Sequence, residues 1–147
     1  GLNYYGRFAV RFSPWALTQA FGAHVQPDTS RCGDTDWGQP FPQGLTRGLQ
    51  RLGALGVPVL VTENGLQTRN DSERAAYIQS HVEAVRDALA AGVDVRGYFH
   101  WSLIDNFEWA EGWRPRFGLL ELDLDTGKRT PRPSAEVFAA ICRNNGP

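Results

Sequence analysis

The sequence predicts an α/β fold built on a parallel sheet. Segments typical of strands alternate with segments whose apolar residues recur at helical spacing, in the order strand, helix, strand, helix, strand, helix. Consecutive parallel strands require crossover helices of this kind. Three such units in 147 residues cannot close an eight-stranded barrel, which takes about 250 residues. We therefore expect a partial α/β barrel over residues 1–147, with the remainder of the barrel upstream of Gly1.

The first half of the chain divides into four predicted segments. Residues 2–8 are rich in aromatic side chains and predict a short strand. Residues 9–41 contain repeated prolines and glycines, which predict a long loop. Leucines at helical spacing predict a helix over residues 43–55, ended by the glycine and proline that follow. Residues 58–62 form an apolar run that is typical of a strand buried on both faces.

A second helix is predicted after Asn70. Asn70 can cap the helix, with Glu73 as its reciprocal partner, and Gly92 ends it. The expected buried stripe consists of Ile78, Val82, Val85 and Leu89.

The last third of the chain begins with a strand over residues 93–101 and a loop over residues 102–116. Residues 117–124 are expected to be extended and to lead into a turn over residues 125–128. Ser134 is expected to cap a final helix. That helix would bury Val137, Phe138 and Ile141.

Composition excludes several classes of partner. Lys and Arg total 15 and Asp and Glu total 16, so the net charge of −1 argues against nucleic acid or an anionic membrane as the main partner. The two cysteines, Cys32 and Cys142, have no metal-ligand spacing and are expected to be free thiols. They leave the compartment open, with the cytoplasm favoured over secretion. The chain has neither a His/Cys ligand set nor a glycine-rich phosphate loop, so no metal or organic cofactor is expected.

Polar residues at the predicted strand ends are the first candidates for chemistry, because reacting groups in parallel α/β sheets lie where strands end at their carboxyl side. Glu63 directly follows a buried strand, and Gly65 allows a sharp turn behind it. Tyr5 ends another strand and could donate a hydrogen bond that holds this carboxylate ionised. Glu63 could equally be a solvated loop charge or a helix-end partner, and a tyrosine such as Tyr5 is more often an aromatic residue of the core or rim.

Tryptophans and acids are concentrated after the third predicted strand. Aromatic faces stack on sugar rings and carboxylates accept pairs of hydroxyl hydrogen bonds, so a loop that mixes both is suited to a carbohydrate pocket. A Trp-rich core edge with surface acids is the alternative, and the neighbouring His100 is expected to be a core histidine. The residues concerned are Trp101, Trp109, Trp113, Asp105, Glu108 and Glu111.

Four segments in order carry a resemblance to a known family. They are Gly1-Leu2-Asn3-Tyr4-Tyr5, Val61-Thr62-Glu63-Asn64-Gly65, the run from Gly97 to Trp109 that reads GYFHWSLIDNFEW, and Arg116-Phe117-Gly118-Leu119. Together they resemble glycoside hydrolase family 1, the β-glucosidase family of retaining (β/α)8 TIM-barrel enzymes. The first segment is similar to the family's sixth barrel strand. The resemblance implies that the chain is the C-terminal third of a family member, holding strands 6 to 8.

The resemblance implies a role for each of seven residues. Glu63 aligns with the catalytic nucleophile, which forms a glycosyl-enzyme intermediate, and Tyr5 with the tyrosine that hydrogen-bonds it. Trp101 aligns with the platform under the sugar in the −1 subsite. The other substrate-binding positions are Glu108 and Trp109 for the outer hydroxyls, Phe117 for a wall of the pocket and Asn3 for its edge. The position of Trp113 is more often Tyr in the family.

The resemblance also implies a substrate class and the absence of one catalytic residue from this chain. The 6-phospho-glycosidase branch lacks the Glu108-Trp109 pair and adds a lysine; this chain keeps the pair and has no lysine nearby, so an unphosphorylated β-glycoside or oligosaccharide is expected. The family's acid/base glutamate lies in an Asn-Glu-Pro motif that this chain does not contain. The chain is therefore expected to need the missing N-terminal part of the barrel. The alternative is a non-catalytic half-barrel module that binds sugars or a partner.

Overall fold

The structure is a computed structural model that describes residues 1–15, 17, 22–24 and 37–146. Its centre is a three-stranded sheet in the order β1 (Leu2–Asn3), β4 (Val59–Asn64) and β5 (Val95–His100). Both strand pairs are parallel. The connections between them carry the helices α1 (Pro42–Gly53) and α2 (Asp71–Ala90). The α/β fold predicted from the alternation of strands and helices is confirmed.

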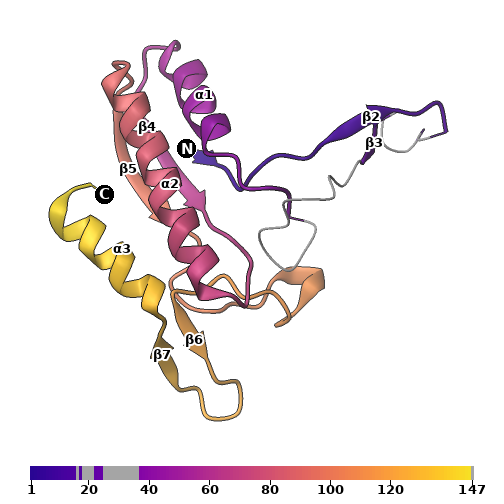
Figure 1. The fold of residues 1–147 in the computed structure, drawn as a ribbon, viewed down its shortest axis with the longest axis vertical. Coiled ribbons are helices and arrows are strands. Elements are labelled where there is room, and N and C mark those ends of the chain that lie inside the picture. The colour runs from indigo at the N-terminus through magenta and orange to yellow at the C-terminus, as the bar shows by residue number, and fades with distance from the viewer. Residues whose placement is uncertain (16, 18–21, 25–36, 147) are drawn as a thin grey trace.

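Two helices cover one face of the sheet (Figure 1). Alternation along β4 directs Val59 and Val61 toward this face, where they are buried, and leaves Leu60 and Thr62 exposed on the other. The core between sheet and helices consists of Leu45, Leu49, Val59, Val61, Ala84, Val85, Ala88 and Val93. The leucine spacing thus predicted the buried face of α1 correctly at Leu45 and Leu49.

Within the part of the chain that the structure describes, the opposite face of the sheet is uncovered. Leu60 on β4 is 40% exposed and Phe99 on β5 is 58% exposed. Parallel sheets normally bury both faces, because an exposed apolar face costs about 25 cal/mol per Å² of surface left in water. The expectation that residues 58–62 are buried on both faces therefore does not hold for the chain as it stands.

Several element boundaries differ from those that the sequence predicts. The first strand ends at Asn3, and Arg7 instead pairs with Gln39 through two backbone hydrogen bonds of 2.8 and 2.9 Å. The predicted loop over residues 9–41 contains an antiparallel pair, β2 (Val10–Phe12) and β3 (Gly22–His24), which projects from the sheet (Figure 1). Cys32 lies outside the described residues, and Cys142 is a free, exposed thiol.

The ends and the buried faces of α1 and α2 agree only in part with those that the sequence predicts. The first helix stops before the exposed Leu55, because Gly56 adopts a left-handed conformation with φ of +71°. Asn70 does cap α2, with its Oδ1 accepting from the Ser72 amide at 3.3 Å. Within the predicted stripe, Ile78 and Val85 are buried but Leu89 is 48% exposed. The other buried residues of α2 are Arg74, Tyr77, His81, Ala84 and Ala88.

The prediction that Ser134 caps the last helix is wrong. The last helix, α3 (Pro133–Asn144), has Arg132 at its cap position and Ser134 inside its first turn. The Ser134 amide and hydroxyl both donate to the Asp71 carboxylate at 2.7 Å, so Ser134 joins α3 to α2. The preceding segment forms an antiparallel pair, β6 (Leu120–Leu122) and β7 (Arg129–Pro131).

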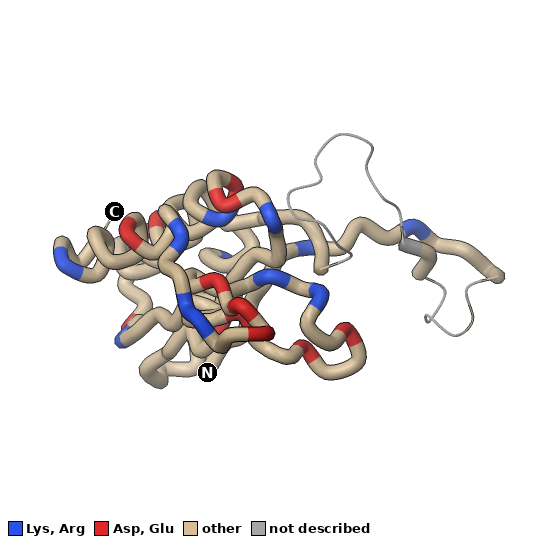
Figure 2. Tube along the Cα trace, turned by 90° about the horizontal axis from the view of Figure 1, so that it is seen from below, with Lys and Arg blue, Asp and Glu red and all other residues tan. Residues whose placement is uncertain are grey.

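Residues of both charges occur throughout the described chain. Basic and acidic residues are interspersed along the tube in Figure 2. Over the described residues, the helices are too short or too polar to cross a lipid bilayer.

Candidate active site

The ends of β1 and β4 bring Glu63 and Tyr5 together. Glu63 is the penultimate residue of β4, and in the parallel register it lies opposite Asn3. The Tyr4 amide continues this pairing by donating to the Glu63 carbonyl at 2.9 Å. The Tyr5 hydroxyl then donates to Glu63 Oε2 at 2.6 Å. The hydrogen bond expected between these two residues is therefore present.

Tyr5 is held as a hydrogen-bond donor. Burial raises the pKa of its phenol, and the hydrogen bond to Glu63 and the negative charges of Glu63 and Glu108 raise it further. A phenol with a raised pKa keeps its proton at neutral pH.

Two further aromatic rings surround Tyr5. The ring centroid of Phe117 lies 6.0 Å from that of Tyr5, and Trp37 lies 5.9 Å from Tyr5 and 5.4 Å from Phe117. Phe117 is 1% exposed. The sequence did not single out Trp37 as a site residue. Trp37 lies in the predicted long loop, which was recognised only by its glycines and prolines. Its position beside Tyr5 is a tertiary contact with no local signature.

Asn3 and Trp101 flank the site along the sheet. Asn3 is the exposed last residue of β1, and its Oδ1 accepts from the Thr62 hydroxyl at 2.6 Å. Trp101 directly follows β5, and its amide donates to the Asn64 carbonyl at 2.9 Å. A Cβ on Gly65 would lie 1.8 Å from the Trp101 carbonyl oxygen. Gly65 is therefore required for this close approach, a different reason from the sharp turn that the sequence predicted.

The three acids of the tryptophan-rich loop have different partners. Glu108 is 8% exposed, and its Oε2 accepts from Asn106 Nδ2 at 2.7 Å. Glu111 forms an exposed ion pair with Arg114. Asp105 is 3% exposed and accepts hydrogen bonds from Arg132 and from the Gly118 amide. Among these three acids, Glu108 is therefore the buried one that forms no ion pair in the described structure.

The tryptophans of the same loop are more exposed than a closed pocket would leave them. Trp109 is 85% exposed in a single 3-10 turn (Trp109–Glu111), with a φ of 45°. Trp113 is 39% exposed and packs edge-on against Phe107 at 5.7 Å. Tyr5, Glu63 and Phe117 thus form the assembled part of the predicted site, whereas Trp109 lies at the surface of this chain.

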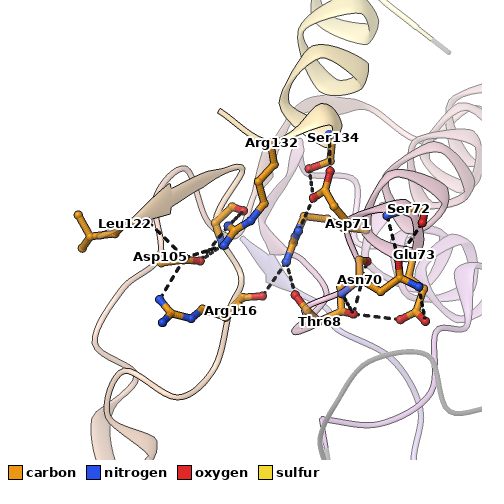
Figure 3. A network of polar contacts seen from close by, with 12 residues as sticks. Thr68, Asn70, Asp71, Ser72, Glu73, Asp105, Arg116, Leu122, Arg132 and Ser134 are labelled. Carbon is orange, nitrogen blue, oxygen red and sulfur yellow. Dashed lines mark hydrogen bonds and ion pairs between the residues drawn. The ribbon is translucent and has the colours of Figure 1, made fainter. Parts of the chain in front are cut away.

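A network of buried ion pairs fixes this loop to the rest of the fold (Figure 3). Arg132 at the start of α3 donates to Asp105 at 2.8 Å, and Arg116 donates to the same carboxylate at 3.3 Å. The fully buried Arg74 of α2 pairs with Asp71 and donates to the carbonyl of Arg116 at 2.8 Å. The network positions the segment that carries Glu108 and Phe117 at its two ends.

His100 is half-buried at the end of β5, and neither of its ring nitrogens has a hydrogen-bond partner among the described residues, so the expectation of a satisfied core histidine does not hold. Its ring lies 5.8 Å from the ring of Phe138 on α3. Burial and the charge of Arg74 lower the pKa of His100 to about 4. Among the described residues, no three His, Cys, Asp or Glu side chains are grouped so that they could hold a metal ion.

Comparisons with known proteins identify the family of this chain. The sequence model of Glycosyl hydrolase family 1 matches residues 1–147. The chain is 38% identical to a β-galactosidase of Pyrococcus woesei over 99% of this chain and 32% of the relative, and 34% identical to β-glucosidase A of Thermotoga maritima over 99% and 34%. The chain therefore belongs to glycosyl hydrolase family 1. It spans about a third of the length of these relatives.

Solved structures of β-glycosidases also superpose on this chain. A β-glycosidase from Pyrococcus horikoshii superposes with a TM-score of 0.85 at 40% identity, covering 97% of this chain and 34% of that one. The family 1 β-glucosidase from Thermotoga maritima superposes with a TM-score of 0.90 at 33% identity, covering 100% and 34%. The latter enzyme in complex with glucoimidazole superposes with a TM-score of 0.89 at 33% identity, covering 100% of this chain and 34% of that one.

Proposed function

We propose that this chain is the nucleophile-bearing portion of a retaining β-glycosidase that hydrolyses unphosphorylated β-glycosides. The observation that carries the proposal is the 2.6 Å hydrogen bond from the Tyr5 hydroxyl to Glu63 Oε2 at the carboxyl end of the sheet. This is where reacting groups lie in α/β barrels. Membership of a family with relatives named β-galactosidase and β-glucosidase supports it.

The reaction would be a double displacement. A carboxylate oxygen of Glu63 attacks the anomeric carbon, the bond to the leaving oxygen breaks, and an acid glutamate outside this chain protonates that oxygen. The same glutamate then removes a proton from water. The resulting attack on the anomeric carbon breaks the ester to Glu63 and releases the sugar with its β configuration retained. Tyr5 orients the Glu63 carboxylate between the two steps.

The remaining site residues would hold the sugar. We assign Trp101 as the platform beneath the ring in the −1 subsite, and Glu108 as the acceptor of its outer hydroxyls. Asn106 already occupies Oε2 of Glu108, which leaves Oε1 for the substrate. Phe117 and Trp37 form a wall, Trp109 joins Glu108 at the outer hydroxyls, and Asn3 lies at the pocket edge. The complexes of the Thermotoga maritima enzyme with glucoimidazole and with deoxynojirimycin support a sugar-like ligand.

The chain would form strands 6 to 8 of a (β/α)8 barrel, as β1, β4 and β5 respectively. The uncovered sheet face with Leu60 and Phe99 supports this assignment, because the inside of a closed barrel is packed with such side chains. The edge strands β1 and β5 would then pair with strands 5 and 1 of the upstream part. The same apolar face argues against an independent half-barrel module, which would leave it in water.

The test is covalent labelling of the complete protein with 2,4-dinitrophenyl 2-deoxy-2-fluoro-β-glucoside. The good leaving group needs no acid, and the fluorine slows breakdown of the ester. We expect the intact mass to rise by one fluoro-sugar, and peptide mapping to locate it on Glu63. A label on another residue, or none, would overturn the assignment.

A further inference from the structure

The backbone of Tyr5 is held by side chains rather than by a neighbouring strand. Because β1 ends at Asn3, the carbonyl groups of Tyr4 and Tyr5 lie beyond the described strand ladder and need other partners. Asn64 Nδ2 donates to the Tyr4 carbonyl at 2.6 Å, and the Tyr77 hydroxyl donates to the Tyr5 carbonyl at 2.8 Å. Both donors come from outside β1, one from β4 and one from α2.

These donors belong to one directional network. The Tyr98 hydroxyl on β5 donates to Asn64 Oδ1 at 2.7 Å, which fixes the orientation of the amide. Asn64 Nδ2 in turn donates to the Tyr77 hydroxyl at 2.9 Å. Each hydroxyl proton has one acceptor, so the three side chains satisfy one another without conflict. Asn64 is fully buried, and Tyr77 is 3% exposed.

The network closes a ring around the proposed nucleophile. Asn64 follows Glu63 at the end of β4, where the strand register is irregular, and its side chain bonds to Tyr77 of α2 on the helix-covered side of the sheet. From there the hydrogen bonds run through Tyr77 to the Tyr5 carbonyl, and the Tyr5 hydroxyl returns to Glu63 Oε2. His81 stacks on the Tyr77 ring at 3.7 Å and holds it in place.

We propose that Asn64, Tyr77 and Tyr98 are positioning residues that set the Tyr5 hydroxyl against the Glu63 carboxylate. The inference rests on the proposed function, since it concerns attack by Glu63. The hydrogen bonds of these side chains lead to the Tyr4 and Tyr5 carbonyls, so the three are proposed to act through Tyr5. A displacement of about 1 Å at a reacting group can cost a hundredfold in rate, so a network that fixes Tyr5 has a measurable effect on catalysis.

The experiment measures the rate constant of Glu63 labelling by the same fluoro-glucoside in the complete protein. Tyr77→Phe removes the hydroxyl that donates to Tyr5 and keeps the ring. Thr46→Val is the matched control, because the Thr46 hydroxyl donates to the Ala84 carbonyl at 3.0 Å and so ties α2 to α1 without joining the network. We expect a fall of about tenfold for Tyr77→Phe and less than about twofold for Thr46→Val, with unchanged affinity for the unreacted glucoside.

A double-mutant cycle separates positioning from general stability. On a Tyr5→Phe background, Tyr77→Phe should cost less than about twofold, because the group it positions is gone. If the effects of Tyr5→Phe and Tyr77→Phe on the labelling rate constant multiply, the inference is overturned. It is also overturned if Tyr77→Phe lowers this rate constant no more than Thr46→Val does. If Tyr77→Phe does not fold, Tyr98→Phe decides by the same cycle. Absence of a label on wild-type Glu63 would instead overturn the proposed function.

Discussion

The Tyr5 hydroxyl donates to Glu63 Oε2 across 2.6 Å, joining two strand ends that are 58 residues apart in the sequence. Hydrogen bonds to charged groups contribute about 1.5–3 kcal/mol, which corresponds to roughly ten- to a hundredfold in rate if the bond must be in place for attack. Tyr5→Phe should therefore lower kcat by this factor. Steady-state kinetics on an aryl β-glycoside measures it, and a kcat equal to that of the wild type would remove Tyr5 from the mechanism.

The buried Asp105 carboxylate is predicted to be essential for stability. Removing it in Asp105→Ala leaves Arg132 and Arg116 without their shared partner, with side chains that are only 14% and 23% exposed. Loss of one partner from such a buried cluster costs about 3–5 kcal/mol. Urea unfolding measures the loss. The control is Asp94→Ala, which breaks an exposed pair with Arg96 and should leave stability unchanged.

Gly65 is predicted to tolerate no side chain. In Gly65→Ala the new Cβ would meet the Trp101 carbonyl oxygen at 1.8 Å, so the ends of β4 and β5 must separate. We expect a loss of about 3 kcal/mol in the free energy of unfolding, together with weaker sugar binding because Trp101 moves. Gly146→Ala, where a Cβ meets nothing within 4 Å, should be neutral. Equal stability of the two variants would contradict the close approach.

Stability is predicted to fall in mildly acidic solution. Burial lowers the pKa of His81 to about 4, and burial with the charge of Arg74 does the same for His100. Between pH 6.5 and 4 the unfolded chain binds more protons than the folded chain, so stability is present above pH 6.5 and is lost as the pH falls toward 4. Each histidine contributes up to about 1.4 kcal/mol per pH unit.

Urea unfolding at a series of pH values between 7 and 4.5 measures this slope. His81→Gln should reduce it by about half, because one of the two protons no longer binds. The pKa values of the Asp71 and Asp105 carboxyls are lowered, so in the folded chain these groups titrate below the usual range of an aspartate. They therefore contribute little to the slope of stability between pH 7 and 4.5. Stability that does not change between pH 7 and 4.5 would show that the two rings are not buried in neutral form.

The spacing of apolar residues along the sequence predicted the helices and strands, because this spacing depends on which face of each single element is buried. The leucine spacing identified the buried face of α1 through Leu45 and Leu49, and the apolar run before Glu63 located a strand end. The parallel order of the sheet followed from the alternation of elements. Helix ends were less predictable, since Ser134 has the chemistry of a cap but bonds to Asp71, 63 residues away.

The site was predictable only in part because its finer organisation consists of long-range contacts. Asp105 was grouped with sugar-binding acids, yet its partner Arg132 is 27 residues away and no spacing rule connects them. Trp37 beside Tyr5, and Tyr77 behind it, likewise carry no local signal. Both positions depend on how the loop after β1 and the helix α2 pack against the strand ends.

The central claim, that Glu63 is the nucleophile, is tested most directly by Glu63→Ala in the complete enzyme with and without azide. We predict that turnover of a dinitrophenyl β-glucoside falls at least about a thousandfold. Azide should then restore part of it by attacking from the vacated side, so that NMR detects an α-glycosyl azide. Glu136→Ala, which removes an exposed carboxylate paired with Arg143, should keep full activity. Normal turnover in Glu63→Ala, or a β-configured azide product, would contradict the account.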